Sequence, residues 1–115
     1  MAYVLRNNME KIEFTIRYTK LFNIYGNLLP DSQRNILNDY FFMDLSITEI
    51  SENRKISRAA VEDALRKGIK KLDYYEGRLN ILKKKEAALD EANRLNELVQ
   101  SQIDLGILLS ILEDF

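Results

Sequence analysis

Apolar side chains recur along most of this chain at steps of three and four residues, which places them on one face of an α-helix. No segment sustains the alternation of apolar and polar positions that is typical of a β-strand. The pattern therefore predicts an all-α fold. We expect Gly26 and Asn27 to end the first helix, because both tolerate a left-handed backbone. That helix covers about residues 8–25, with an apolar stripe formed by Phe14, Tyr18, Leu21, Phe22 and Tyr25.

A second helix is predicted directly after Leu29. Pro30 suits the first helical position, where its missing N–H costs nothing, and Asp31 in the first turn complements the helix dipole. We expect Asp39 and Asp44 to be surface groups. The buried face of this helix should consist of Ile36, Leu37, Tyr40 and Phe41.

A short third helix and a fourth helix are separated by a tight turn at residues 54–56. Ser46 and Glu49 fit a capping box at the start of the third helix, which should end near Asn53, and Ser57 caps the fourth helix. A short helix that braces a second one with an exposed start is a helix-turn-helix. The inward face of the fourth helix carries Val61, Leu65, Ile69 and Leu72. Its outward face carries Arg58, Ala59, Glu62, Asp63, Arg66 and Lys70.

The pattern shifts near residues 74–78, where Gly77 is expected to mark a bend before a long fifth helix over residues 79–113. Alternating steps of three and four residues make a coiled-coil-like seam of Leu95, Leu98, Gln102, Leu105, Leu109 and Leu112. Two burial partners stay open for this seam. One is the first helix of the same chain, and the other is a second copy in a homodimer through Leu95, Leu98, Leu105, Leu109 and Leu112.

We therefore expect a helix-turn-helix domain at residues 1–77, with its core module at residues 29–72, and a C-terminal helix at residues 78–115 for packing or dimerisation. The length of 115 residues suits a single small core. The chain has no Cys and no His, which excludes thiolate metal sites and removes the commonest general base. With no nucleophile–base pair or phosphate loop in the sequence, we expect no enzyme, no metal and no cofactor.

The sequence also favours a soluble, cytoplasmic protein. No apolar run approaches the roughly 20 residues that span a bilayer, and residues 1–6 are too short and too mixed for a secretory signal. Most Tyr and Phe residues fall on the apolar stripes, so core packing is a better interpretation than base stacking, with Tyr74 and Tyr75 as the exception.

The net charge of −1 conceals a strong local bias. Residues 54–71 carry seven basic and two acidic side chains, a local charge of +5 that would attract phosphates. Ser57 offers a hydroxyl to a phosphate, and Arg58 and Arg66 are long enough to reach phosphates or base edges. A solvated helix face with the pairs Glu62–Arg66 and Asp63–Lys67 remains an alternative. The candidate nucleic-acid-binding residues are Arg54, Lys55, Ser57, Arg58, Ala59, Glu62, Arg66, Lys67 and Lys70.

Several segments resemble region four of bacterial sigma factors in order and spacing. They are the runs LPDSQR at residues 29–34, LSITEISE at 45–52, ISRAAV at 56–61 and KKL at 70–72. The short helix before them, with the run LFNIYGNLL at residues 21–29, and the Lys/Glu-rich helix after them make the whole layout similar to the YlxM family of small bacterial proteins. The resemblance implies an all-α helix-turn-helix bundle of sigma region-four type, without a wing and with a long C-terminal helix.

The YlxM resemblance also implies a function, because that family is encoded beside signal-recognition-particle genes. It implies a regulatory protein that binds duplex DNA or the particle's RNA, or that contacts the particle's proteins. The family usually has Leu and Gly where this chain has Arg54 and Lys55, so the turn should cost on the order of 1 kcal/mol. Glu62 and Asp63 place negative charge where DNA would approach. An alternative is therefore a protein–protein interaction module whose helix-turn-helix no longer binds DNA.

Overall fold

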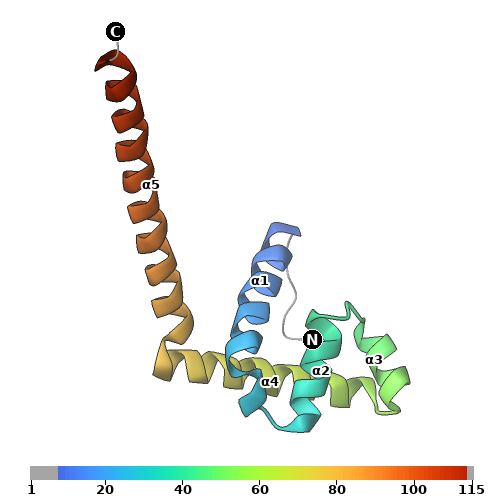
Figure 1. Cartoon of the computed structure of the whole chain (residues 1–115). Coiled ribbons are helices and arrows are strands. Elements are labelled where there is room, and N and C mark those ends of the chain that lie inside the picture. Colours follow the sequence, from blue (N-terminus) through green and yellow to red (C-terminus); the bar gives the residue numbers. More distant parts are fainter. Residues whose placement is uncertain (1–7, 114–115) are drawn as a thin grey trace. The chain divides into compact units, whose positions relative to one another are not determined.

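A computed structural model describes residues 8–113 of the chain. Residues 1–7 and 114–115, and with them the segment that we considered as a secretory signal, lie outside the described part. All regular structure within residues 8–113 is helical, so the predicted all-α fold is confirmed (Figure 1). The elements are α1 (Asn8–Tyr25), the 3₁₀ turn η1 (Gly26–Leu28), α2 (Asp31–Phe41), α3 (Ile47–Arg54), α4 (Arg58–Leu79) and α5 (Ile81–Glu113).

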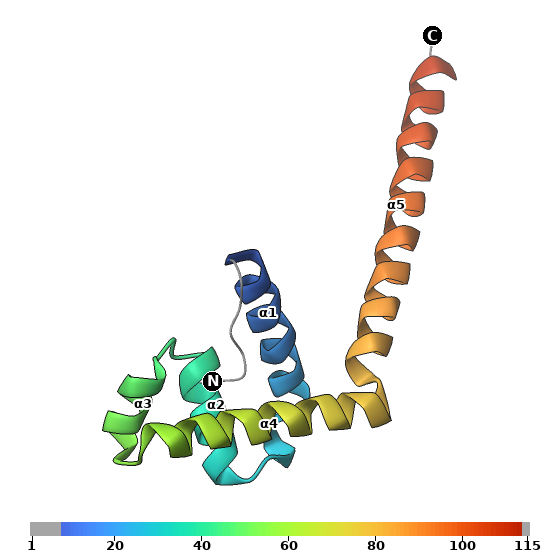
Figure 2. The same ribbon diagram turned by 180° about the vertical axis from the view of Figure 1, so that it is seen from behind.

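The described residues fall into two units that divide between Leu82 and Lys83. In the first unit α4 is the central element, because α1, α2 and α3 all pack against it (Figures 1 and 2). The predicted inward residues of α4 are all buried, as are Ile36 and Leu37 of α2, whereas Tyr40 and Phe41 are half-buried. The core cluster consists of Leu21, Tyr25, Leu29, Ile36, Leu37, Ile50, Val61, Leu65, Leu72 and Leu82.

The first helix has the predicted bounds, but the backbone that follows it and the position of Pro30 differ from the prediction. Gly26 and Asn27 do not use a left-handed backbone but continue into η1. Pro30 lies one position before the first helical residue, with a ψ of 150°. Its carbonyl accepts the backbone N–H groups of Gln33 and Arg34 at 3.0 and 2.9 Å. Pro30 therefore serves α2 as an acceptor at the helix start, where its lack of an N–H has no consequence.

The predicted bend at Gly77 is wrong, because α4 continues through this residue to Leu79. The chain turns at Asn80 instead, which takes the left-handed conformation with a φ of 54°. Its N–H is bonded to the carbonyl of Glu76 at 2.8 Å. Asn is among the few residues that accept this backbone at low cost. It can therefore end a helix at a position where the sequence has no Gly.

A buried polar cluster fixes the start of α5. The side chain of Glu76 is almost fully buried, and its Oε1 accepts the Tyr25 hydroxyl at 2.7 Å and the N–H of Leu82 at 3.0 Å. The N–H of Ile81 bonds to the Tyr25 hydroxyl oxygen at 3.3 Å. Side chains from α1 and α4 thus satisfy the N–H groups at the start of α5. Burial, together with the hydrogen bond to Glu76, raises the pKa of Tyr25.

The second unit is the remainder of α5 from Lys83 onward. All of its described residues are exposed, including the leucines of the predicted seam, which are 52–58% exposed. The helix is apolar on more than one side, because Ile103, Ile107 and Ile111 lie away from the seam on the helix. These three side chains are also at least half exposed. No helix within residues 8–113 is long and apolar enough to cross a membrane.

Candidate nucleic-acid interface

The helix that braces the interface, α3, begins with the predicted capping box. The backbone N–H of Glu49 donates to Oγ of Ser46 at 3.1 Å, and Oε1 of Glu49 accepts the N–H of Ser46 at 3.3 Å. Ile50, which has no exposed surface, anchors α3 in the core. The capping box and this anchor fix both the start and the rotation of α3 against α4.

The turn of the helix-turn-helix depends on a single left-handed residue. The third helix runs one residue further than predicted, through Arg54, and Lys55 then takes a φ of 57° and a ψ of 44°. The backbone N–H groups of Lys55 and Ile56 both bond to the carbonyl of Ser51. Lys55 therefore bears the strain that Gly would have avoided, and its side chain is exposed to solvent.

Arg54, by contrast, points toward α2. Its Nε lies 2.6 Å and its second guanidinium nitrogen 3.1 Å from the two carboxylate oxygens of Asp39. Asp39 is only 9% exposed, so the prediction that it is a surface group is wrong. The hydrogen bond to Asp39 raises the pKa of Arg54. This pair occupies Arg54 and removes it from the cations available to a ligand.

The first turn of α4 is exposed. Oγ of Ser57 accepts the N–H of Ala60 at 3.0 Å, as expected for its capping role. That bond uses an acceptor site, so the hydroxyl proton can still be donated to a phosphate. Arg58 and Ala59 follow on the exposed surface.

Two of the predicted contact residues are held by an acidic neighbour on the same helix. Oδ1 of Asp63 lies 2.5 Å from Arg66, and Oδ2 lies 2.9 Å from Lys67. The predicted Asp63–Lys67 pair is therefore confirmed, whereas Arg66 pairs with Asp63 and not with Glu62. The hydrogen bond from Lys67 and the charge of Arg66 hold the pKa of Asp63 below its usual value.

Four cations of the basic segment at residues 54–71 remain: Lys55, Arg58, Lys70 and Lys71. Within residues 8–113 none of them forms an ion pair, and all are exposed except Lys71, which is half-buried. Arg58 and Lys70 are separated by about 18 Å along the helix axis. These cations begin at the turn and continue past the middle of α4, where Lys70 and Lys71 lie on different sides of the helix, and we call the four together the strip. Lys71 is absent from the predicted contact residues, although the charge count alone would have included it.

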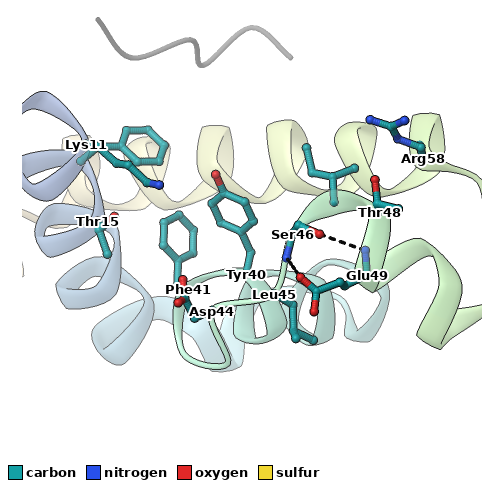
Figure 3. Close-up of a pocket in the computed structure, with 12 residues that line it drawn as sticks. Lys11, Thr15, Tyr40, Phe41, Asp44, Leu45, Ser46, Thr48, Glu49 and Arg58 are labelled. Carbon is teal, nitrogen blue, oxygen red and sulfur yellow. Dashed lines mark hydrogen bonds between the residues drawn. The ribbon is translucent and has the colours of Figure 1, made fainter. Parts of the chain in front are cut away.

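A cavity of about 430 Å³ adjoins the start of this strip (Figure 3). Its walls come from α1, the end of α2, the loop to α3, the first turn of α3 and the first residue of α4. Figure 3 shows Tyr40 and Phe41 between Lys11 at one end and Arg58 at the other. The lining residues are Lys11, Phe14, Thr15, Tyr40, Phe41, Asp44, Leu45, Ser46, Ile47, Thr48, Glu49 and Arg58.

No group of three potential metal ligands occurs among the described residues. The chemistry that the site offers is therefore that of hydrogen-bond donors, positive charge and aromatic surface. Groups of these kinds are typical of contacts to phosphates and bases.

The sequence was also compared with known proteins. Residues 12–107 match the UPF0122 family of YlxM / p13 like helix-turn-helix proteins. A UPF0122 protein of Malacoplasma penetrans is 34% identical over 90 residues, which cover 73% of this chain and 84% of the relative. One of Caldanaerobacter subterraneus is 38% identical over 81 residues, 70% of this chain and 69% of the relative.

A third relative extends the similarity along nearly the whole chain. A UPF0122 protein of Halalkalibacterium halodurans is 33% identical over 102 residues, which cover 89% of this chain and 94% of the relative. This is a helix-turn-helix family and not a known family of enzymes. The helix-turn-helix of the structure and the match over most of the sequence agree, and the chain belongs to the UPF0122 family of YlxM-like proteins.

Proposed function

We propose that this protein is a nucleic-acid-binding regulator that acts through its helix-turn-helix and has no enzymatic activity. The observation that carries the proposal is the strip formed by Lys55, Arg58, Lys70 and Lys71, with which no carboxylate of the described residues forms an ion pair. Such a strip supplies the sequence-independent attraction that dominates the affinity of proteins for nucleic acid. The exposed first turn of α4, with Ser57 and Arg58, is the part that would approach base edges.

We infer that the protein acts in the cytoplasm as a participant in the signal-recognition-particle pathway. The resemblance of residues 29–72 to sigma region four favours duplex DNA as the ligand. The association of YlxM proteins with signal-recognition-particle genes favours the particle's RNA or its proteins. The helix-turn-helix geometry supports nucleic acid over protein, because it exposes Lys55, Ser57 and Arg58 at the start of the second helix.

The test is a gel-shift titration of the full chain against a DNA duplex and against a signal-recognition-particle RNA at low salt. We expect binding to at least one of them and a weakening of at least tenfold in the Lys55→Ala/Arg58→Ala variant. The matched control is Lys84→Ala/Lys85→Ala, which removes the same charge from α5 and should leave the affinity unchanged. If the protein binds neither the DNA nor the RNA, the proposal is overturned.

We further propose that α5 pairs with α5 of a second copy. The exposed seam has heptad spacing, and Gln102 in its middle would set the register, as a polar residue at such a position does in coiled coils. The charge of this helix is self-complementary. Residues 83–94 carry a net +1, whereas residues 95–113 carry a net −3 and no basic residue. An antiparallel pair therefore brings the acidic end of each helix toward the basic start of the other.

Sedimentation equilibrium of the full chain tests this pairing. We expect a dimer for the wild type and a monomer for Leu105→Glu/Leu109→Glu, because each charge would be buried in the seam. Ser101→Glu/Ser110→Glu adds the same charge outside the seam and should remain dimeric. A monomeric wild type would overturn the pairing.

A second function also has an observation in its favour. Asp63 neutralises Arg66 and Lys67, and the leucines of α5 are exposed, as expected of a protein–protein interaction module. This alternative is supported if the isolated protein binds neither nucleic acid but co-purifies with signal-recognition-particle proteins, and if that association is lost in Leu105→Glu/Leu109→Glu.

A further inference from the structure

The cavity at the start of α4 combines features that a purely structural crevice does not need. It contains three aromatic rings, two cations and two carboxylates, and it opens beside Arg58 in the positive strip. We propose that this cavity binds one unpaired nucleotide of the bound nucleic acid. The inference rests on the proposed function, and it specifies which nucleic acids the protein prefers.

The aromatic surface is the first argument. Phe14, Tyr40 and Phe41 line the cavity and are each half-buried, so a part of each ring faces outward. The rings form one cluster, with centroids of Phe14 and Phe41 5.9 Å apart and those of Tyr40 and Phe41 5.2 Å apart. The inner sides of these rings belong to the apolar faces of the first two helices. The sides that face the cavity offer a surface on which a base can stack.

The cations are the second argument. Lys11 and Arg58 lie at opposite ends of the cavity with Tyr40 and Phe41 between them (Figure 3). Neither forms an ion pair among the described residues. A nucleotide whose base lies over the rings has one phosphate on each side along the strand, and each phosphate would then meet one cation. Arg58 belongs to both the strip and the cavity, so a bound strand can pass from one to the other.

The polar rim indicates the kind of base. Asp44 and Glu49 also line the cavity, and Glu49 is engaged through Oε1 with the N–H of Ser46. Carboxylates accept hydrogen bonds from the exocyclic amines of bases, whereas uracil and thymine have no such amine. We therefore expect adenine, cytosine or guanine, each of which has an exocyclic amine, to be preferred in the cavity over uracil.

A paired base cannot enter this cavity, because it stays stacked within its duplex. The ligand is therefore a duplex with one unpaired nucleotide, or a hairpin with a splayed base. Recognition of such unstacked bases on aromatic surfaces is the usual way in which proteins read RNA. A cavity of about 430 Å³ is within the size range of small-ligand sites.

The test compares two probes that differ only in one extra unpaired adenine within an otherwise identical duplex, prepared as RNA and as DNA. Fluorescence anisotropy at low salt should show that the full-length wild type binds the bulged probe about tenfold more tightly than the paired probe. Replacement of the unpaired adenine by uracil should reduce this preference.

Lys11→Gln is the decisive variant, because Lys11 lines the cavity but is remote in sequence from the strip, and its exposed position leaves the fold intact. It should lose most of the preference for the bulge while its affinity for the paired probe stays that of the wild type. Tyr40→Leu should do the same, with circular dichroism as the check on folding. Lys20→Gln, on the same helix but outside the cavity, is the matched control and should keep the preference.

Equal affinity of the wild type for bulged and paired probes, or an undiminished preference in Lys11→Gln, would overturn the cavity assignment while leaving the proposed function in place. Loss of binding to both probes by the wild type would overturn the proposed function, and the cavity assignment with it.

Discussion

Arg54 at the end of α3 and Asp39 near the end of α2 form an ion pair with two contacts, at 2.6 and 3.1 Å. The pair joins the bracing helix to its neighbour next to the turn whose Lys55 has a left-handed backbone. The YlxM resemblance implied Leu at the position of Arg54. In this chain the position instead forms a charged pair with α2.

Breaking this pair should destabilise the module. We expect Arg54→Met to lower the free energy of unfolding by about 2 kcal/mol, since it leaves Asp39 without its partner in a largely buried site. The value is below that of a fully buried pair because the Arg54 side chain is 37% exposed. Chemical denaturation measures it, and Asp39→Asn/Arg54→Met should recover part of the loss. If nucleic-acid affinity fell in the folded Arg54→Met variant, Arg54 would be a contact residue after all.

Asp63 should weaken the binding of nucleic acid. Asp63→Asn releases Arg66 and Lys67, so we expect tighter binding and a slope of log affinity against log salt that is steeper by about 1 to 2. Glu62→Gln removes the same negative charge without releasing a paired cation. Its slope should therefore stay at the wild-type value, and an equal response of both variants would show that the pairing has no role.

The sequence was sufficient for the parts of this structure that depend on local periodicity and capping. The inward residues of α4 and the capping box of Ser46 follow from the spacing of side chains within one helix. The Arg54–Asp39 pair could not be predicted in the same way, because its two partners belong to different helices. A lone Asp on a polar stretch offers no signal that it will be buried.

The candidate site could be predicted only in part from the sequence, because its residues too belong to different helices. The run of basic residues identified Arg58 and Lys70, but not which cations a neighbour would neutralise, and it missed Lys71. Lys11 and Tyr40 are not among the predicted contact residues, because α1 and α2 reach the start of α4 only in the folded chain. The bend expected at Gly77 is wrong because Asn80 takes the left-handed backbone that ends α4.

Gly68 should be intolerant of a side chain. An added Cβ would lie 2.6 Å from Cδ1 of Leu37, which is itself fully buried, so this side chain would have to shift within the packed core. We expect Gly68→Ala to lower the free energy of unfolding by about 1 kcal/mol, since overpacking outweighs the gain in helix propensity. Gly77→Ala, in the same helix but with nothing within 4 Å, should instead raise it by up to about 1 kcal/mol. Thermal unfolding compares the two, and stabilisation by both would contradict the predicted contact.

The hydrogen bond between Tyr25 and Glu76 should make the start of α5 sensitive to alkaline pH. The pKa of Tyr25 is raised in the folded protein, so its contribution to stability is complete below the ordinary tyrosine value of about 10. The contribution is lost as the pH rises through the folded pKa. Tyr18, held by burial and by Asp73, has its pKa raised to about 12 and should behave likewise.

The variant Tyr25→Phe tests this contribution to stability at neutral pH and at alkaline pH. At neutral pH it should lower the free energy of unfolding by about 1 to 2 kcal/mol, because Glu76 loses a hydrogen bond in a buried site. Above about pH 10 it should lose less stability than the wild type. Tyr74→Phe, which removes the hydroxyl of an exposed tyrosine, should leave the neutral-pH stability unchanged. An identical alkaline profile for Tyr25→Phe and the wild type would contradict the assignment.

The central claim is that a strip of unneutralised cations on the helix-turn-helix binds nucleic acid, and the salt dependence of the binding constant tests it most directly. With four contacts, log affinity for a DNA duplex should fall against log salt with a slope of about −3 to −4. Arg58→Gln/Lys70→Gln should reduce the steepness by about 2, whereas Lys84→Gln/Lys85→Gln should not change it. A slope near zero for the wild type, or the same slope in both double variants, would contradict the account.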